Sequence, residues 1–165
     1  SNEFFVAGLI HDIGKLVIYI TLPNEFLKLV KTTRHLKLKF MAFETEKRVI
    51  GMTHDEVGMR LLKKWMFPES LLTAIGFHHR LQETEKKSLL PVVVHIADIF
   101  AHLYEMQTVV EVDDPLKTET LFPDIIKLAQ SYEIEWDESD LNRLQQSLTE
   151  SIEKEAVAFG LFFGN

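Results

Sequence analysis

The sequence predicts an all-α fold, a compact multi-helix bundle, and three observations support it. Apolar residues recur at three- and four-residue steps along most of the 165 residues, as they do on the buried face of a helix. Alternating apolar and polar runs, which are typical of strands, are nearly absent. Signals that begin helices, such as Pro23 and the pair Thr53 and Glu56, precede several of the periodic segments.

In the first half of the chain, the apolar segment 3–20 is expected to be a helix interrupted by the polar pair His11 and Asp12. A short helix over 42–50 should stop near Gly51, and Pro68 opens a helix over 69–79. The helix that begins at Pro23 would bury a stripe of four residues: Phe26, Leu27, Val30 and Leu36. Thr53 and Glu56 form a capping box for a helix over 54–66. That helix would turn four residues inward: Val57, Leu61, Leu62 and Trp65.

The second half begins with residues 89–105, which are apolar on nearly every face. Their length favours a buried central helix over a strand rich in valine. After a polar loop over 106–120, helices are expected near 123–132 and after Asp137, which can cap the last one. The last helix has an apolar stripe of five residues: Leu141, Leu144, Leu148, Ile152 and Phe159. We expect residues 1–106 to carry the functional site without their upstream helices, and 107–165 to form a C-terminal helical extension packed on the same domain.

Composition restricts the function. With no cysteine, the chain has no disulfide and no thiolate site, so imidazole and carboxylate must hold any metal. This donor set suits zinc, iron or manganese, and the sequence does not distinguish these from magnesium. A net charge of −7 disfavours nucleic acid as a partner, although bound cations would let a small phosphorylated ligand approach. The apolar runs look too short to cross a bilayer, and no signal peptide is visible, so we expect a cytoplasmic protein that does not engage a membrane.

His11 and Asp12 interrupt an apolar segment, and Lys15 follows one helical turn later. Charged groups in such surroundings need partners, because burying an unpaired charge is costly. A metal ion held by His11 and Asp12 would meet this need. A buried hydrogen bond between His11 and Asp12, with Lys15 reaching to solvent, would meet it too.

Three further histidines are candidate ligands. His78 and His79 end a predicted apolar helix, although a histidine pair at a helix end is more often exposed. His54 stands in the first turn of a capped helix, where the helix dipole should keep its imidazole neutral and able to bind a metal. Taken alone, His54 would more readily be interpreted as an ordinary surface residue of a helix N-terminus.

Asp98 interrupts the most apolar helix of the chain, and a carboxylate there needs a cation or several donors to stay ionised. His95 lies one turn earlier on the same face, so a simple pair of His95 and Asp98 is the alternative. We leave His102 and His35 out of the candidate site, because His102 should approach solvent and His35 stands among lysines.

Together the elements read His11-Asp12-Ile13-Gly14-Lys15, Glu46 with Gly51-Met52-Thr53-His54-Asp55-Glu56-Val57-Gly58, Trp65 with Pro68, Ile75 with His78-His79, and His95-Ile96-Ala97-Asp98. Their order and spacing over about residues 4–104 resemble the HD superfamily of metal-dependent phosphohydrolases, and more closely its HDOD branch, the HD-related output domain of bacterial signalling proteins.

The resemblance implies a role for each matched residue. His11, Asp12 and Asp98 match the core metal ligands of the superfamily. His54, His78 and His79 match positions that add a second metal in its cyclic-dinucleotide phosphodiesterase branch. Lys15 matches a lysine that faces the substrate phosphate there. The chain departs from the pattern in two ways. It lacks the upstream helix with a histidine or glutamate ligand, and Arg80-Leu81-Gln82-Glu83 stands where that branch has a glycine-tyrosine-proline signature.

Three functions follow as alternatives. The first is a bacterial signal-transduction output domain of HDOD type that holds one or two divalent metal ions and relays a signal to a partner domain or protein. The second is an active metal-dependent phosphohydrolase or phosphodiesterase for a nucleotide or cyclic dinucleotide, in which Asp12 bridges two ions and Lys15 neutralises phosphoryl charge. The third is a helical interaction module without metal. A missing upstream helix would also leave an apolar groove through which two copies could form a homodimer.

Overall fold

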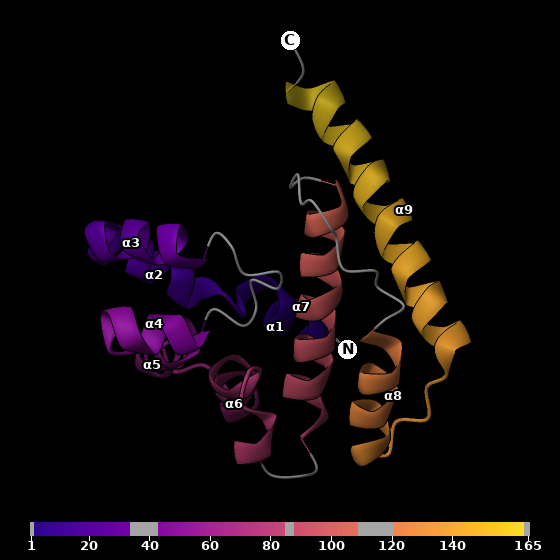
Figure 1. Ribbon diagram of the computed structural model, residues 1–165, viewed down its shortest axis with the longest axis horizontal. Coiled ribbons are helices and arrows are strands. Elements are labelled where there is room, and N and C mark those ends of the chain that lie inside the picture. Colours follow the sequence, from indigo (N-terminus) through magenta and orange to yellow (C-terminus); the bar gives the residue numbers. More distant parts are fainter. Residues whose placement is uncertain (1, 34–42, 85–87, 109–120, 164–165) are drawn as a thin grey trace. The chain divides into compact units, whose positions relative to one another are not determined.

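The computed structural model describes residues 2–33, 43–84, 88–108 and 121–163 (Figure 1). Within these ranges every regular element is a helix, so the all-α prediction is confirmed. The chain divides into two compact units, Ser1–Leu116 and Lys117–Asn165. The packing of a C-terminal extension on the first part of the chain stays a prediction.

The first unit holds helices α1 to α7 and a short 3-10 turn at Leu81–Glu83. The helices are α1 (Asn2–Ile10), α2 (Ile13–Thr21), α3 (Pro23–Thr33), α4 (Phe43–Ile50), α5 (His54–Lys64), α6 (Glu69–Phe77) and α7 (Leu89–Thr108). Helix α2 packs against α5 and α3, α3 against α4, and α5 against α6, which leads to α7 (Figure 1). The predicted helix over 42–50 and the buried helix over 89–105 are both present, and Gly51 follows the former with a φ of +87° that favours glycine.

The core of this unit lies where α1, α5, α6 and α7 meet. Its buried members are Ala7, Leu62, Leu71, Leu72, Ala74, Ile75, Leu90 and Val94. Beside this core, α2 and α5 approach so closely that a Cβ on Gly14 would overlap the carbonyl oxygen of His54 and stand 2.9 Å from the Gly58 nitrogen. Glycine at position 14 therefore sets the distance between the two helices that carry Asp12 and His54 at their N-termini.

Two of the predicted core stripes are wrong in part. On α3 the buried residue is Leu29, whereas Leu27 and Val30 are exposed; Leu36 lies outside the described residues. On α5 Leu62 is buried as predicted, but Trp65 is 56% exposed because the helix ends at Lys64 and the chain turns at Met66, which has a φ of 58°. In both cases the helical period was right, and the face that meets the core was set by neighbouring helices that the period does not reveal.

The predicted helix over 3–20 is two helices, because the chain turns at His11 and Asp12. By length and composition alone, the stretch Asn2–Thr21, with a mean hydropathy of 1.6, is long and apolar enough to cross a bilayer, so the sequence-based exclusion was too strict. One such stretch near an N-terminus is weak evidence, since the core helix of a soluble protein or a signal sequence passes the same test. Here it contains the ion pair of Asp12 and Lys15. The absence of a membrane partner stays a prediction.

The second unit holds α8 (Phe122–Ser131) and α9 (Glu138–Phe163). Asp137 caps α9 as predicted, because its Oδ1 accepts the backbone N–H of Asp140 at 2.9 Å. Leu141 on α9 is fully buried, whereas Leu144 is 42% exposed; the side chain of Phe159 lies outside the described residues. The loop predicted over 106–120 lies outside them too, apart from residues 106–108, which extend α7.

Candidate metal centre

Helix ends bring most of the predicted ligands together. His11 and Asp12 occupy the turn between α1 and α2, and His54 is the first residue of α5. His78 and His79 follow the last residue of α6, and Asp98 projects from the middle of α7. A capping box of Thr53 and Glu56 begins α5, as predicted, and the N–H of Thr53 donates to Glu56 Oε2 at 3.2 Å. The cap fixes where α5 starts and so fixes the position of His54.

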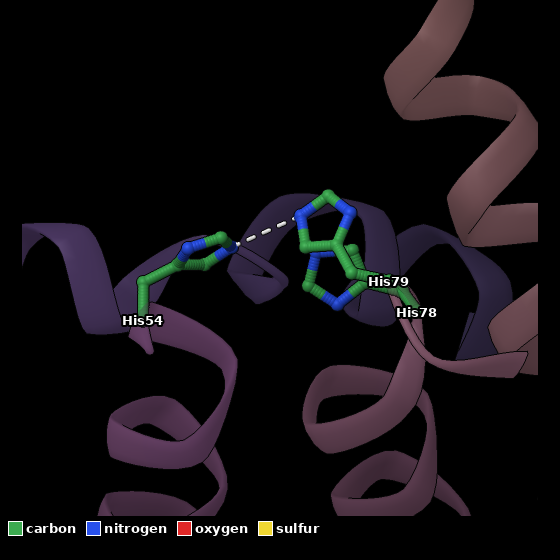
Figure 2. A group of neighbouring side chains, drawn as sticks. All are labelled: His54, His78 and His79. Atoms are coloured by element: carbon green, nitrogen blue, oxygen red, sulfur yellow. Dashed lines mark hydrogen bonds between the residues drawn. The ribbon is translucent and has the colours of Figure 1, made fainter. Parts of the chain in front are cut away.

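Two groups of three side chains could each hold a metal ion. Among the described residues, one is His54, His78 and His79 (Figure 2), of which His54 and His78 are buried, and the other is His11, Asp12 and His78. Within each group, one ligand atom per residue lies within 4.8 Å of the others. Figure 2 shows His54 reaching from α5 toward the histidine pair that follows α6. We call the first group the three-histidine group and the second the His11 group.

Asp98 joins the cluster from α7. Its Oδ1 lies 3.3 Å from Nε2 of His11 and 3.6 Å from Nδ1 of His102. The resemblance groups Asp98 with His11 and Asp12, and the structure places Asp98 beside this pair. Burial would raise the pKa of Asp98, but the hydrogen bond from His11 and the nearby His102 lower it. Asp98 therefore has the donors that keep its carboxylate ionised.

The cluster contains buried polar atoms that the protein itself does not satisfy. Among the described residues, His78 Nε2, His79 Nδ1 and Asp98 Oδ2 are buried without a hydrogen-bond partner. Oδ1 of Asp12 lies 3.1 Å from His54 Nε2, but outside hydrogen-bond geometry. Unpaired buried polar atoms of this kind are costly, and a cation would satisfy those that offer a lone pair, such as His78 Nε2 and Asp98 Oδ2. Imidazole and carboxylate donors fit a divalent ion of the zinc, iron or manganese type.

His54 is held by a carboxylate that the sequence analysis did not place in the site. Oε2 of Glu46, a buried residue of α4, lies 2.7 Å from the His54 backbone nitrogen and 2.7 Å from its Nδ1. With Nδ1 carrying the proton for this contact, Nε2 of His54 faces Asp12 Oδ1 and, at 3.2 Å, His79 Nε2. A carboxylate behind a histidine orients the ring and makes its other nitrogen a better metal ligand.

The protonation predicted for His54 is wrong for the metal-free protein. Burial would lower its pKa, but the carboxylates of Asp12 and Glu46 raise it to about 9. The helix dipole, which favours a neutral imidazole at this position, is worth only about 0.3–1 kcal/mol, and two adjacent carboxylates outweigh it. His54 is thus charged at neutral pH, and the proton on its Nε2 stands between Asp12 and His79.

His78 and His79 are neutral. Burial and the charges of His54 and His11 lower the pKa of His78 to about 4. Burial lowers the pKa of His79 far below its usual range, and the electrostatic effects of His78 and His54 lower it further. Nδ1 of His78 donates to the carbonyl oxygen of Ile75 at 2.9 Å, so its Nε2 carries the lone pair. These two histidines are ready to bind a metal without losing a proton.

Lys15 lies at the edge of the cluster, half-buried, with its Nζ 2.6 Å from Asp12 Oδ2. Burial would raise the pKa of Asp12, but His54, Lys15 and His11 lower it below its usual range. The sequence left two interpretations of His11 and Asp12 open: a shared metal ion, or a hydrogen bond between them with Lys15 reaching to solvent. In the structure Lys15 pairs with Asp12 instead, and the other oxygen of Asp12 faces His54. His95, the alternative partner of Asp98, hydrogen-bonds the backbone of His78.

Two residues near the cluster were missed. Glu46 shares an apolar stripe with Phe43 and Ile50, at steps of three and four residues, and a lone carboxylate on such a stripe was the available signal. His102 was set aside as solvent-facing, yet only 15% of its side chain is exposed and it contacts Asp98 one turn away. His35 lies outside the described residues.

A second network joins the two helix ends that carry the three-histidine group. Arg80, one residue after His79, pairs through Nε with Oδ2 of the fully buried Asp55 at 3.2 Å. It also donates to the Gly76 carbonyl at 2.8 Å, and the Thr53 hydroxyl donates to the same Asp55 carboxylate. This network ties the start of α5 to the end of α6.

Comparison with known proteins places the N-terminal half in a family. Residues 1–81 match the HDOD domain, a branch of the HD-like superfamily. The match ends before α7, so Asp98 lies beyond it. An uncharacterized protein of Treponema pallidum (strain Nichols) is 28% identical over 93 residues, which are 55% of this chain and 18% of that protein. The chain thus spans about a fifth of the length of this relative. No solved structure matches.

Proposed function

Because residues 1–81 belong to the HDOD domain family, we propose that this chain is a regulatory output domain of bacterial signal transduction that holds a divalent metal ion in its His/Asp cluster. The observation that carries the proposal is the set of buried atoms that offer a lone pair and have no hydrogen-bond partner in the protein, above all His78 Nε2 and Asp98 Oδ2. A helical interaction module without metal would leave these atoms unpaired at a cost of about 1–3 kcal/mol each.

The residues of the two groups, together with Asp98, would hold the ion. The neutral His78 and His79 offer lone pairs, and Asp12 and Asp98 offer negative charge. When bound, a divalent cation supplies positive charge to the cluster and acts as a Lewis acid toward an oxygen ligand. In a regulatory domain these residues would join the start of α5 and the end of α6 to the turn before α2 when the ion is bound, so that helix packing would differ between the loaded and the metal-free protein. A signalling domain or protein that binds this surface would detect the difference.

A hydrolytic function is the second candidate, and Lys15 favours it. Its side chain is 30% exposed at the edge of a buried cluster, where its ammonium group can contact a phosphoryl oxygen of a nucleotide or cyclic dinucleotide. Asp12 has one oxygen toward Lys15 and the other toward His54, so its carboxylate lies between the ammonium group and the histidines that would hold a metal. In this case Lys15 orients the substrate and neutralises its charge.

Metal analysis of protein purified without a histidine tag tests the metal-binding part. We expect zinc, iron or manganese in the wild type, little in Asp12→Asn, and the wild-type content in the control Asp124→Asn, which changes an exposed aspartate on α8. The proposal fails if the folded wild type takes up none of these metals. Hydrolysis assays over nucleotides and cyclic dinucleotides with added manganese or iron separate the two candidates. Metal-dependent turnover that Asp12→Asn and Lys15→Met both abolish would favour the enzyme.

A further inference from the structure

The four histidines of the cluster are held in two different ways. Nδ1 of His11 lies 2.7 Å from the carbonyl oxygen of Gly8, and Nδ1 of His78 lies 2.9 Å from that of Ile75. Each of these contacts runs to a residue three positions earlier, so the preceding helix orients its own histidine. His54 and His79 have no such contact among the hydrogen bonds of the described residues, and both meet side chains of α4 instead.

Helix α4 presents two side chains to these histidines from one face. Glu46 accepts the backbone N–H and the Nδ1–H of His54 through one oxygen, at 2.7 Å each. Phe43, one turn earlier, stacks on the ring of His79 with a centroid distance of 5.5 Å and an interplanar angle of 4°. Residues three apart lie on the same side of a helix, so both contacts depend on the placement of α4 as a whole.

We infer that α4 is the positioning element of the three-histidine group: Glu46 fixes the ring of His54 so that Nε2 points into the cluster, and Phe43 fixes the plane of His79. Lys47 anchors the helix to the start of α5, because its Nζ lies 2.8 Å and 2.9 Å from the two oxygens of Glu56. Among the contacts of the described residues, α4 meets the cluster at His54 and His79, so a displacement of α4 would act first on these two histidines.

This inference deepens the proposed function and rests on it, since it gives the metal site a helix through which a partner can alter metal binding. Its first test uses the metal-free protein. In protein with nitrogen-15 histidine, NMR should detect a slowly exchanging Nδ1 proton on His54. The signal should persist in Glu46→Gln, whose amide oxygen can still accept it, and in the control Glu44→Ala, an exposed residue of the same helix. It should disappear in Glu46→Asp and Glu46→Ala, which cannot reach the ring.

The second test measures the affinity for Zn²⁺ by competition with a chelator. Glu46→Asp and Glu46→Ala should bind about 10–100-fold more weakly, the range for losing a partner that orients a metal-bound histidine. Glu46→Gln and Phe43→Leu should lose less, and Glu44→Ala should match the wild type. Circular dichroism identifies variants that do not fold. If Glu46→Ala is among them, the comparison of Glu46→Asp with Glu46→Gln shows whether Glu46 positions His54.

The outcomes are distinguishable. If folded Glu46→Asp binds Zn²⁺ as tightly as the wild type, or if the Nδ1 proton survives without an acceptor at position 46, the positioning role is refuted. If the wild type binds no Zn²⁺, manganese or iron, the proposed metal function fails. The NMR signal then still reports whether Glu46 orients His54, because it is measured without metal.

Discussion

Metal binding should release a proton from His54, and the affinity should therefore rise with pH. In the metal-free protein the pKa of His54 is about 9, since Asp12 and Glu46 hold the charged form against the effect of burial. At pH 7 this histidine is protonated, and an ion in the three-histidine group must displace the proton from Nε2. His78, with a pKa of about 4, has no proton to lose at this pH.

The size of the effect follows from the distance between the pH and the pKa of His54. Below pH 9, each unit of pH should strengthen binding about tenfold, or ~1.4 kcal/mol per proton displaced. From pH 6.5 to 8.0 the expected gain is roughly 30-fold, or about 2 kcal/mol. Above about pH 9 the dependence on His54 should end.

Isothermal titration calorimetry with Zn²⁺ measures the released proton directly. In two buffers of different ionisation enthalpy at pH 7, the difference in heat should correspond to about one proton per ion. Chelator competition at pH 6.5, 7.25 and 8.0 provides the affinities. An affinity that is constant over this range, together with equal heats in the two buffers, would show that His54 is neutral or lies outside the metal site.

Three further predictions concern stability. Gly14→Ala should destabilise the fold by about 1–3 kcal/mol, because its Cβ would meet the His54 backbone. Gly8→Ala, whose Cβ would have nothing within 4 Å, should stabilise the fold by about 0.5–1 kcal/mol. Urea unfolding measures both, and equal effects would contradict the close approach of α2 and α5. The pKa of His78 is lowered to about 4, so the stability that its neutral form contributes is present above pH 6.5 and is lost as the pH falls through 4. Between pH 6.5 and 5, the free energy of unfolding of the metal-free wild type should fall by up to about 2 kcal/mol, and that of His78→Gln should not show this loss. Identical pH profiles of the free energy of unfolding would count against this. Arg80→Ala should lower the free energy of unfolding by about 3–5 kcal/mol, because it leaves the fully buried Asp55 without its cation. The double variant Arg80→Ala, Asp55→Asn should recover part of that loss in thermal unfolding. Additive effects of the two substitutions would argue against the ion pair.

Most of the fold could be predicted from the sequence because the helices are amphipathic and begin at recognisable signals. Pro23, the capping box at Thr53 and the cap at Asp137 all mark helix starts that the structure confirms. The faces of the helices were harder to predict. Trp65 and Leu27 follow the apolar period of their helices and are nevertheless exposed, because burial depends on which neighbouring helix is present.

The candidate site was predictable where a polar residue interrupts an apolar segment. His11, Asp12 and Asp98 stood out for this reason, and the structure brings them together. Glu46 belongs to the quoted pattern but was given no role in the site, because it lies in a short helix rich in charged residues and its burial becomes visible only in the structure. The charge of His54 could not be predicted from the sequence either, because it depends on Glu46 and Asp12, which are distant from one another along the chain.

His78 belongs to both groups of ligands, and its chemistry limits how they can be filled. Nδ1 is engaged by the Ile75 carbonyl, which leaves a single nitrogen with one lone pair, and an imidazole lone pair coordinates one ion at a time. In this arrangement the two groups compete for His78. A second ion would have to rely on the carboxylates of Asp12 and Asp98, and it would be held more loosely than the first. If the cluster takes up two ions, this shared histidine predicts stepwise loading, with one tightly and one weakly retained equivalent.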